Sequence, residues 1–174
     1  MVWITQNSAD MQITRRNEPY LDDELKQLLE SSVLTDYPTR RAAALPVLHA
    51  IQDKYGYLPY QAIEEAAGFL DISAAELLDT VTFYEEFRLE PMGKYVIWVC
   101  QSLSCELMGE KTVEQIVSDK LCIKPGRTTD DGKFSLMKVE CLGSCGTAPC
   151  MLINETLYEC LDHEKIIQII NSLE

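Results

Sequence analysis

Residues 140–149 have the sequence Glu-Cys-Leu-Gly-Ser-Cys-Gly-Thr-Ala-Pro, in which three residues separate Cys141 from Cys145. They follow directly on Phe134–Val139, an apolar run that the turn dipeptide Asp131-Gly132 introduces. This order predicts a strand that ends in a cysteine pair beside two glycines.

A second cysteine pair stands in the same relation to a second predicted strand. The apolar run Tyr95–Val99 is typical of a buried strand. Cys100 follows that run, and Cys105 comes after four further residues. Two close pairs that each begin where a strand ends can converge at one edge of a sheet. The sequence therefore predicts one shared site for these four cysteines.

Four thiolates around one point suit a soft metal ion or an iron–sulfur cluster. Gly143 and Gly146 let backbone N–H groups approach sulfur, and the sulfides of a cluster need such hydrogen bonds. Structural zinc stays open, because gaps of two to four residues are usual in zinc knuckles. Zinc knuckles tend to replace a core, however, whereas this part of the chain has apolar segments for a core of its own. A [2Fe–2S] cluster is the favoured interpretation, and zinc is the alternative.

The other three cysteines are interpreted as bystanders. Cys122 and Cys160 each stand alone in a patterned segment, which is typical of buried thiols. Cys150 follows Pro149 at the start of a predicted strand, and we expect a buried thiol rather than a ligand. Thiol redox catalysis is disfavoured, because no two cysteines are separated by two residues.

The composition is that of a globular protein, with 174 residues, 47% of them hydrophobic and 25% charged. The formal net charge of −13 disfavours nucleic-acid binding, because an acidic surface repels phosphate. No apolar run is long enough to span a membrane. Residues 1–7 lack the basic start and apolar block of a secretory signal. We therefore expect a reducing, cytosol-like compartment, where cysteines more often bind metals than form disulfides.

The chain divides into two parts, with the seam near residues 90–93. Residues 1–92 hold no cysteine, and residues 93–174 hold all seven. Helical periodicity predicts four short helices in the first part, a small bundle, at residues 21–29, 45–55, 59–70 and 73–81. Pro46 should kink the second helix, unless the helix starts later. Phe83 is expected to pack in the core rather than to face a partner.

In the second part, segments with apolar residues at strand spacing alternate with segments that have them at helical spacing. The predicted order is strand, helix, strand, strand, helix, over residues 95–99, 113–121, 134–139, 151–158 (a hairpin) and 166–173. This is an α/β unit of about 80 residues, a size typical of thioredoxin-like domains. The fold class is therefore α+β: a four-helix bundle followed by an α/β domain.

Residues 141–149 resemble the signature Cys-Leu-Gly-x-Cys-x-x-Ala-Pro of the thioredoxin-like [2Fe–2S] subunit of respiratory NADH:quinone oxidoreductase, complex I. Val99-Cys100 with Cys105 resembles the first cysteine pair of that family. The similarity runs from about Tyr37 to the C-terminus. Its further matches are Tyr37-Pro38, Ala44-Leu45-Pro46, Gln52, Tyr55-Gly56-Tyr57, Val81-Thr82-Phe83-Tyr84, Asp131-Gly132-Lys133-Phe134 and the turn at Asn154.

The resemblance implies that Cys100, Cys105, Cys141 and Cys145 bind one [2Fe–2S] cluster as cofactor and are the ligands of its metal ions. It implies a thioredoxin-like domain with a mixed sheet after the helical bundle. The implied partner is the subunit that binds flavin (FMN) and NADH and performs the hydride chemistry, so the isolated chain would not turn over NADH. The cluster would lie near that flavin, in the peripheral arm of a bacterial complex on the cytoplasmic side of the membrane, among other peripheral-arm subunits.

Two alternatives accompany this interpretation. Similar subunits occur in NAD-reducing hydrogenases and NAD-dependent formate dehydrogenases. In this first alternative the chain binds the same cofactor but belongs to a different complex. A zinc-stabilised interaction module belongs to a different class. Cys150 departs from the family, which often has an apolar residue there.

Overall fold

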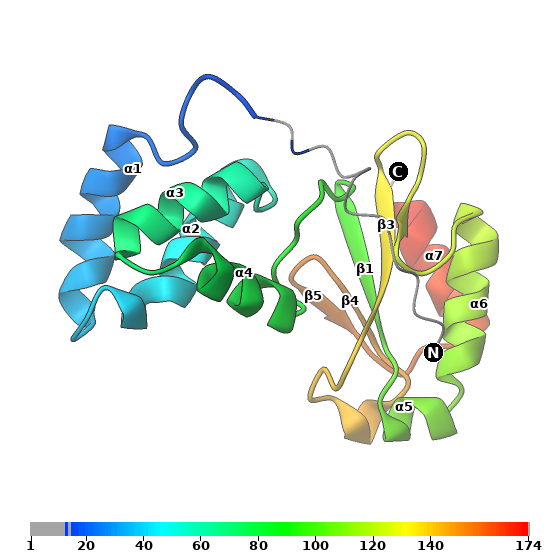
Figure 1. The fold of residues 1–174 in the computed structure, drawn as a ribbon. Coiled ribbons are helices and arrows are strands. Elements are labelled where there is room, and N and C mark those ends of the chain that lie inside the picture. Colours follow the sequence, from blue (N-terminus) through cyan, green and yellow to red (C-terminus); the bar gives the residue numbers. More distant parts are fainter. Residues whose placement is uncertain (1–12, 14, 174) are drawn as a thin grey trace. The chain divides into compact units, whose positions relative to one another are not determined.

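The computed structural model of the chain describes residue 13 and residues 15–173. The chain forms two compact units, Met1–Pro91 and Met92–Glu174 (Figure 1). Among the described residues, no helix combines the length and the apolar character needed to cross a membrane. Residues 1–7, on which the expectation about a secretory signal rests, lie outside the described part of the chain.

The described part of the first unit is helical. Its α-helices are α1 (Asp23–Leu28), α2 (Ala44–Tyr55), α3 (Tyr60–Leu70) and α4 (Ala74–Phe83). A π-helical turn at Leu29–Val33 and 3₁₀ turns at Leu34–Asp36 and Arg41–Ala43 connect α1 to α2. One buried core unites the helices, and each contributes to it, for example through Leu25, Leu48, Ile63 and Leu77.

Local sequence features set the ends of these helices. The Oγ of Ser73 accepts a hydrogen bond from the N–H of Glu76 at 3.1 Å and so caps the N-terminus of α4. Gly56 ends α2 with φ 81°, as expected for a left-handed glycine stop. Pro46 lies inside the first turn of α2, where its missing N–H leaves no helical hydrogen bond unmade. Of the two predicted alternatives, a kink at Pro46 or a later start, the later start is wrong, because α2 begins at Ala44.

The prediction that Phe83 packs in the core is also wrong. Its side chain is 77% exposed and contacts the ring of Tyr84, with a centroid distance of 5.0 Å. The buried residues of α4 are Leu77 and Val81, four residues apart on one face. Phe83 stands two residues beyond Val81, which turns it to the opposite side of the helix.

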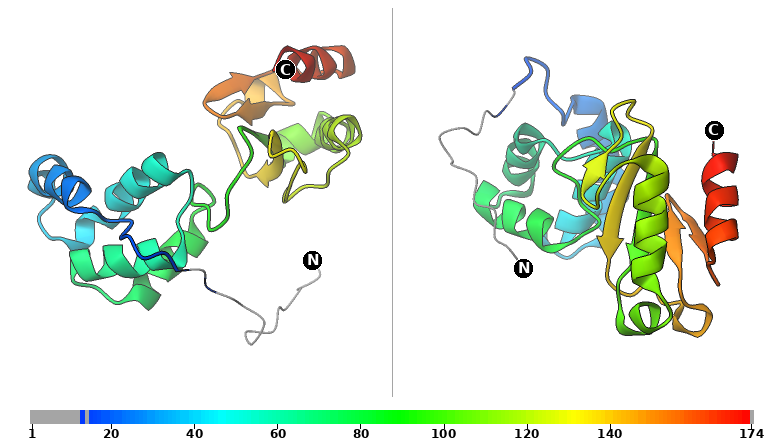
Figure 2. Two further views of the ribbon diagram at one scale, coloured as in Figure 1. Left: turned by 90° about the horizontal axis from the view of Figure 1, so that it is seen from above. Right: turned by 90° about the vertical axis from the view of Figure 1, so that its right-hand side faces the viewer.

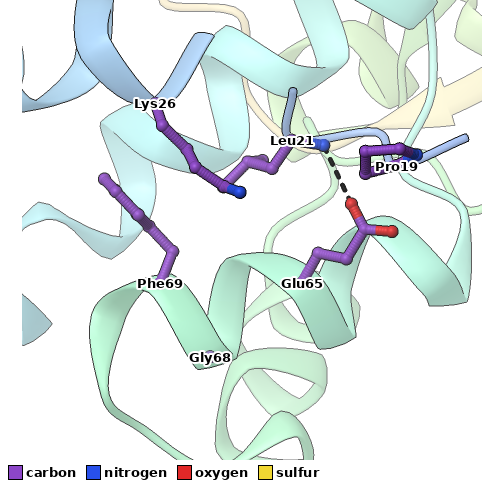
Figure 3. A pocket seen from close by; sticks show the side chains of 6 residues that line it. All are labelled: Pro19, Leu21, Lys26, Glu65, Gly68 and Phe69. Carbon is purple, nitrogen blue, oxygen red and sulfur yellow. Dashed lines mark hydrogen bonds between the residues drawn. The ribbon is translucent and has the colours of Figure 1, made fainter. Parts of the chain in front are cut away.

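The first unit also has a surface pocket between α1 and α3, lined by Pro19, Leu21, Lys26, Glu65, Gly68 and Phe69 (Figure 3). The Glu65 carboxylate accepts hydrogen bonds from the Leu21 N–H at 2.9 Å and from the Gln61 amide at 2.8 Å. These two bonds use both of its oxygens. Glu65 thus secures the segment that leads into α1.

The described part of the second unit mixes strands and helices. Its strands are β1 (Tyr95–Cys100), β2 (Arg127–Thr128), β3 (Phe134–Val139), β4 (Met151–Ile153) and β5 (Thr156–Tyr158). Its helices are α5 (Leu103–Leu107), α6 (Glu110–Leu121) and α7 (His163–Ser172), with a 3₁₀ turn at Cys145–Thr147. The predicted strands, hairpin and two longer helices are present, whereas α5 and β2 were not expected.

The five strands form one mixed sheet in the order β2-β3-β1-β4-β5. Only β1 and β3 run parallel, and the other neighbours are antiparallel. Helices α6 and α7 lie side by side along the sheet (Figures 1 and 2). The core joins Ile97 and Leu136 of the sheet to Val117 of α6 and Ile166 of α7. This packing fixes the sheet edge at which β1 and β3 both end.

Candidate metal centre

The parallel pairing of β1 and β3 brings the two cysteine pairs to one edge of the sheet. Cys100, the last residue of β1, lies opposite Val139, the last residue of β3. The N–H of Gln101 still donates to the Val139 carbonyl at 2.9 Å. Cys141 therefore leaves β3 beside the point where Cys100 leaves β1, as the sequence predicts.

Cys100 and Cys105 form the buried part of the site. Cys100 ends β1, and Cys105 lies in the short helix α5, which begins after Ser102. Both thiols are almost fully buried. Leu142 and Ala148, from the loop that carries the second pair, pack against them. The two cysteine loops thus share one small apolar cluster.

Cys141 and Cys145 form the exposed part of the site. Their Sγ atoms lie 3.4 Å apart, and the N–H of Gly143 donates to the Cys141 sulfur at 3.4 Å. Gly143 has φ +79°, a conformation that glycine adopts at little cost. The prediction that a glycine here lets an N–H reach sulfur is confirmed for Gly143.

Hydrogen bonds across the two loops also perturb the thiols. Burial acts to raise the pKa of Cys100, but hydrogen bonds from the backbone N–H groups of Leu142 and Ser102, and from neighbouring thiols, outweigh it and lower the pKa. The hydrogen bond with Cys141 raises the pKa of Cys145, and the charge of Cys100 adds to this. Of the four predicted ligands, Cys100 and Cys105 belong to a group of cysteines whose sulfurs all lie within 4.8 Å of one another, and Cys141 and Cys145 lie outside that group.

Cys150 is a third thiol beside Cys100 and Cys105. It is buried as expected, and its Sγ lies 3.8 Å from the Cys105 Sγ. The sulfurs of Cys100, Cys105 and Cys150 all lie within 4.8 Å of one another. Burial, together with the hydrogen bond to Cys105, raises the pKa of the Cys150 thiol to about 12.

The prediction that Cys122 and Cys160 are buried is wrong, because both are exposed. Cys122 follows the last residue of α6 with φ +56°, and Cys160 follows β5 with φ +48°. Each therefore stands at the end of an element rather than on its apolar face. Neither belongs to the group of close thiols formed by Cys100, Cys105 and Cys150.

Glu159 holds the loop of the second pair, and sequence reasoning missed it. Its carboxylate accepts hydrogen bonds from the Ser144 hydroxyl and, at 2.5 Å, from the Thr147 hydroxyl. The N–H of Cys160 donates to the Thr147 carbonyl at 2.8 Å. The hydrogen bonds from Ser144 and Thr147 lower the pKa of Glu159. No spacing pattern links Glu159 to a loop that lies twelve to fifteen residues earlier.

The donor set fits a thiophilic metal group. The site offers sulfur donors from four predicted cysteines, and backbone N–H groups already point at the Cys100 and Cys141 sulfurs. Sulfur-only donors favour zinc or iron–sulfur clusters over hard cations. N–H donors to the thiolates are the outer contacts that tune such a centre.

Residues 31–174 match the family described as thioredoxin-like [2Fe-2S] ferredoxin. The chain belongs to that family.

Its relatives carry consistent names. The chain is 36% identical over 154 residues to NADH-quinone oxidoreductase subunit 2 of Thermus thermophilus, covering 87% of this chain and 84% of the relative. It is 36% identical over 149 residues to an NADH-quinone oxidoreductase subunit of Aquifex aeolicus, covering 86% and 92%. It is 39% identical over 146 residues to the subunit of the same name in Rickettsia felis, covering 82% and 87%.

A solved structure is also similar. The crystal structure of an NAD+-reducing [NiFe]-hydrogenase in the air-oxidized state matches with a TM-score of 0.63 and 25% identity. The match covers 72% of this chain but only 22% of the hydrogenase chain.

Proposed function

We propose that this chain is the electron-transfer subunit of an NADH:quinone oxidoreductase and binds one [2Fe–2S] cluster through Cys100, Cys105, Cys141 and Cys145. The observation that carries this proposal is the convergence of two cysteine pairs at one sheet edge. Membership of a [2Fe–2S] family and relatives named as subunits of that enzyme support it. When bound, the cluster accepts and releases single electrons.

The residues around the site set how easily an electron is accepted. The chain carries a formal charge of −13, and four thiolates add negative charge, which favours a low reduction potential. The N–H groups of Leu142 and Gly143 oppose this, because hydrogen bonds to sulfur stabilise the added charge. The protein thus contributes ligation, placement and electrostatic tuning.

The two compact units correspond, in this proposal, to two domains. The helices α1 to α4 share one core, which supports a four-helix bundle as the N-terminal domain, expected over residues 1–92. The mixed sheet with α6 and α7 supports a thioredoxin-like domain over residues 93–174. The bundle contributes no cysteine, so its proposed role is docking.

The proposed partner is the subunit that binds FMN and NADH. Helix α5 carries Cys105 on its buried side and exposes Leu103 and Leu107, which are 70% and 78% exposed. Apolar side chains left in water beside a redox site support docking of another protein there. A partner at α5 would bring its flavin close to the cluster. The assembled complex oxidises NADH in the cytoplasmic peripheral arm, and the isolated chain does not.

The equivalent subunit of an NAD-reducing hydrogenase is the second candidate. The similarity to the NAD+-reducing [NiFe]-hydrogenase structure favours it. An NAD-dependent formate dehydrogenase is the same type of alternative. Neighbouring genes separate them: genes of a membrane quinone module support the first candidate, and hydrogenase or formate dehydrogenase genes support the others.

Spectroscopy of anaerobically purified protein tests the cofactor. We expect visible absorption, an EPR signal after reduction, and about two iron and two sulfide per chain. A colourless protein with stoichiometric zinc and no iron contradicts the proposal and supports a zinc module. Co-purification with a flavin-containing partner tests the assignment to a complex.

Substitution tests the ligand set. Cys141→Ser should remove or strongly alter the EPR signal of the reduced protein, because serine replaces a ligand sulfur by oxygen. Cys122→Ser is the matched control, since Cys122 is exposed and outside the site. The reverse result contradicts the assigned ligands.

A further inference from the structure

Cys150 is placed at the metal centre by strand register. Val99 of β1 pairs with Met151 of β4 in antiparallel register, so the next residues outward, Cys100 and Cys150, also face each other. The N–H of Cys100 donates to the Cys150 carbonyl at 3.3 Å. Residues opposite one another in a sheet project to the same face. Cys150 therefore lies next to Cys100 because of the fold.

The sulfur separations match those of ligands that share a metal ion. Two thiolates on one tetrahedral ion, with metal–sulfur bonds of about 2.3 Å, lie about 3.8 Å apart. The Sγ atoms of Cys105 and Cys150 lie 3.8 Å apart. Those of Cys141 and Cys145, the second proposed pair, lie 3.4 Å apart. The Cys150 sulfur also lies within 4.8 Å of the Cys100 sulfur, so it is near enough to bind an ion that Cys100 and Cys105 would share.

Cys150 thus lies within 4.8 Å of two of the four proposed ligands, Cys100 and Cys105, and the backbone holds Cys105 and Cys150 in different ways. Cys105 lies in a helix of five residues, between the exposed side chains of Leu103 and Leu107. Cys150 directly precedes β4 and is 1% exposed. Both thiols are almost fully buried, so the sulfur that the four-ligand assignment does not use is held as closely in the site as the one that it does use.

We propose that Cys150 is a reserve ligand, which takes the place of Cys105 at the iron shared with Cys100. This inference rests on the proposed function. In the exchange the iron–sulfur bond to Cys105 breaks and a bond to the Cys150 sulfur forms. The Cys150 S–H proton passes to the departing Cys105 thiolate, so neither total charge nor electron count changes.

Iron content of alanine variants tests this exchange, because alanine cannot ligate. The full chain is purified anaerobically as wild type, C105A, C105A/C150A, C105A/C122A and C141A. We expect C105A to retain most of its iron and sulfide, with shifted EPR g-values. C105A/C150A should hold about tenfold less iron than C105A. C105A/C122A, which removes the same number of thiols, should match C105A, and C141A should lose iron because its ligand has no reserve.

Two results overturn the proposal: a C105A variant as poor in iron as C105A/C150A, or a C105A/C150A variant as rich in iron as C105A. Far-UV circular dichroism shows whether each variant is folded. If an alanine variant is not folded, C105S is compared with C105S/C150S. Resonance Raman then distinguishes an Fe–S bond to Cys150 from an Fe–O bond to the introduced serine. Wild-type protein without iron would refute the proposed function instead, so the two failures are distinct.

Discussion

The backbone N–H of Gly143 donates to the Sγ of Cys141 across 3.4 Å, two residues along the chain. This contact needs the left-handed backbone of Gly143, at φ +79°. A β-carbon on Gly143 would meet no heavy atom within 4 Å. The glycine is therefore required by backbone conformation and not by lack of space.

Gly143→Ala should destabilise the protein by about 1–2 kcal/mol, the cost of placing an L-residue in the left-handed region. If the backbone relaxes, the N–H turns away from Cys141, and the reduction potential should fall because a hydrogen bond to the sulfur is lost. Chemical denaturation and a redox titration followed by EPR measure the two effects.

Gly146→Ala is the matched control in the same loop. Gly146 has a negative φ, and its added β-carbon would also meet nothing within 4 Å. We expect stability and potential close to wild type. Equal losses in the two variants would show that the loop tolerates no side chain, for reasons other than backbone conformation.

Glu159 should make the stability of the cysteine loop depend on acid pH. Its pKa is lowered in the folded protein because the Ser144 and Thr147 hydroxyls donate to the carboxylate. A lowered folded pKa means that the contribution to stability is complete above the unfolded pKa of about 4.3, and is lost as the pH falls through the folded value. Glu159→Gln should therefore lower the denaturation midpoint at pH 7 and have a smaller effect below pH 4.

Glu155→Gln is the control for this comparison. Glu155 is an exposed carboxylate in the turn between β4 and β5. Its substitution should leave the pH profile unchanged. A Glu159→Gln variant that loses as much stability at pH 3 as at pH 7 would contradict the charge-dependent role of Glu159.

Gly93 should tolerate no side chain at all. Its N–H donates to the buried Ser135 hydroxyl at 2.8 Å, and an added β-carbon would lie 2.8 Å from the backbone carbonyl carbon of Phe134. Backbone cannot move aside cheaply, so Gly93→Ala should cost about 1–3 kcal/mol in unfolding free energy. Chemical denaturation measures the loss.

Gly68→Ala should act in the opposite direction. Gly68 lies inside α3, and its added β-carbon would meet nothing within 4 Å. Alanine in a helix interior is favoured over glycine by about 0.5–1 kcal/mol. A stabilised Gly93→Ala or a destabilised Gly68→Ala would each contradict the packing described.

Periodicity was enough to predict β1, β3 and the β4–β5 hairpin, because each presents apolar residues at strand spacing between clear turns. The observed parallel register of β1 and β3 brings the ends of both strands, where the predicted cysteine pairs begin, to the same side of the sheet. Helix α5 was not predicted, because five residues carry too little periodicity. Cys150 is buried as predicted, but its nearness to Cys105 was not predicted, because it depends on the register of β4 against β1, which no local pattern encodes.

The exposed apolar side chains of α5 give the last prediction. Leu107 is 78% exposed on the helix that holds Cys105, so Leu107→Asp should leave iron content unchanged and weaken binding of the flavin-containing partner by about tenfold or more. Co-expression with the partner, affinity capture and flavin quantification measure this. Leu157→Asp on β5, at 40% exposure, is the control and should capture wild-type amounts of flavin. If both variants retain the partner equally, docking does not involve α5, because a charge at the centre of an apolar contact cannot be accommodated without loss of affinity.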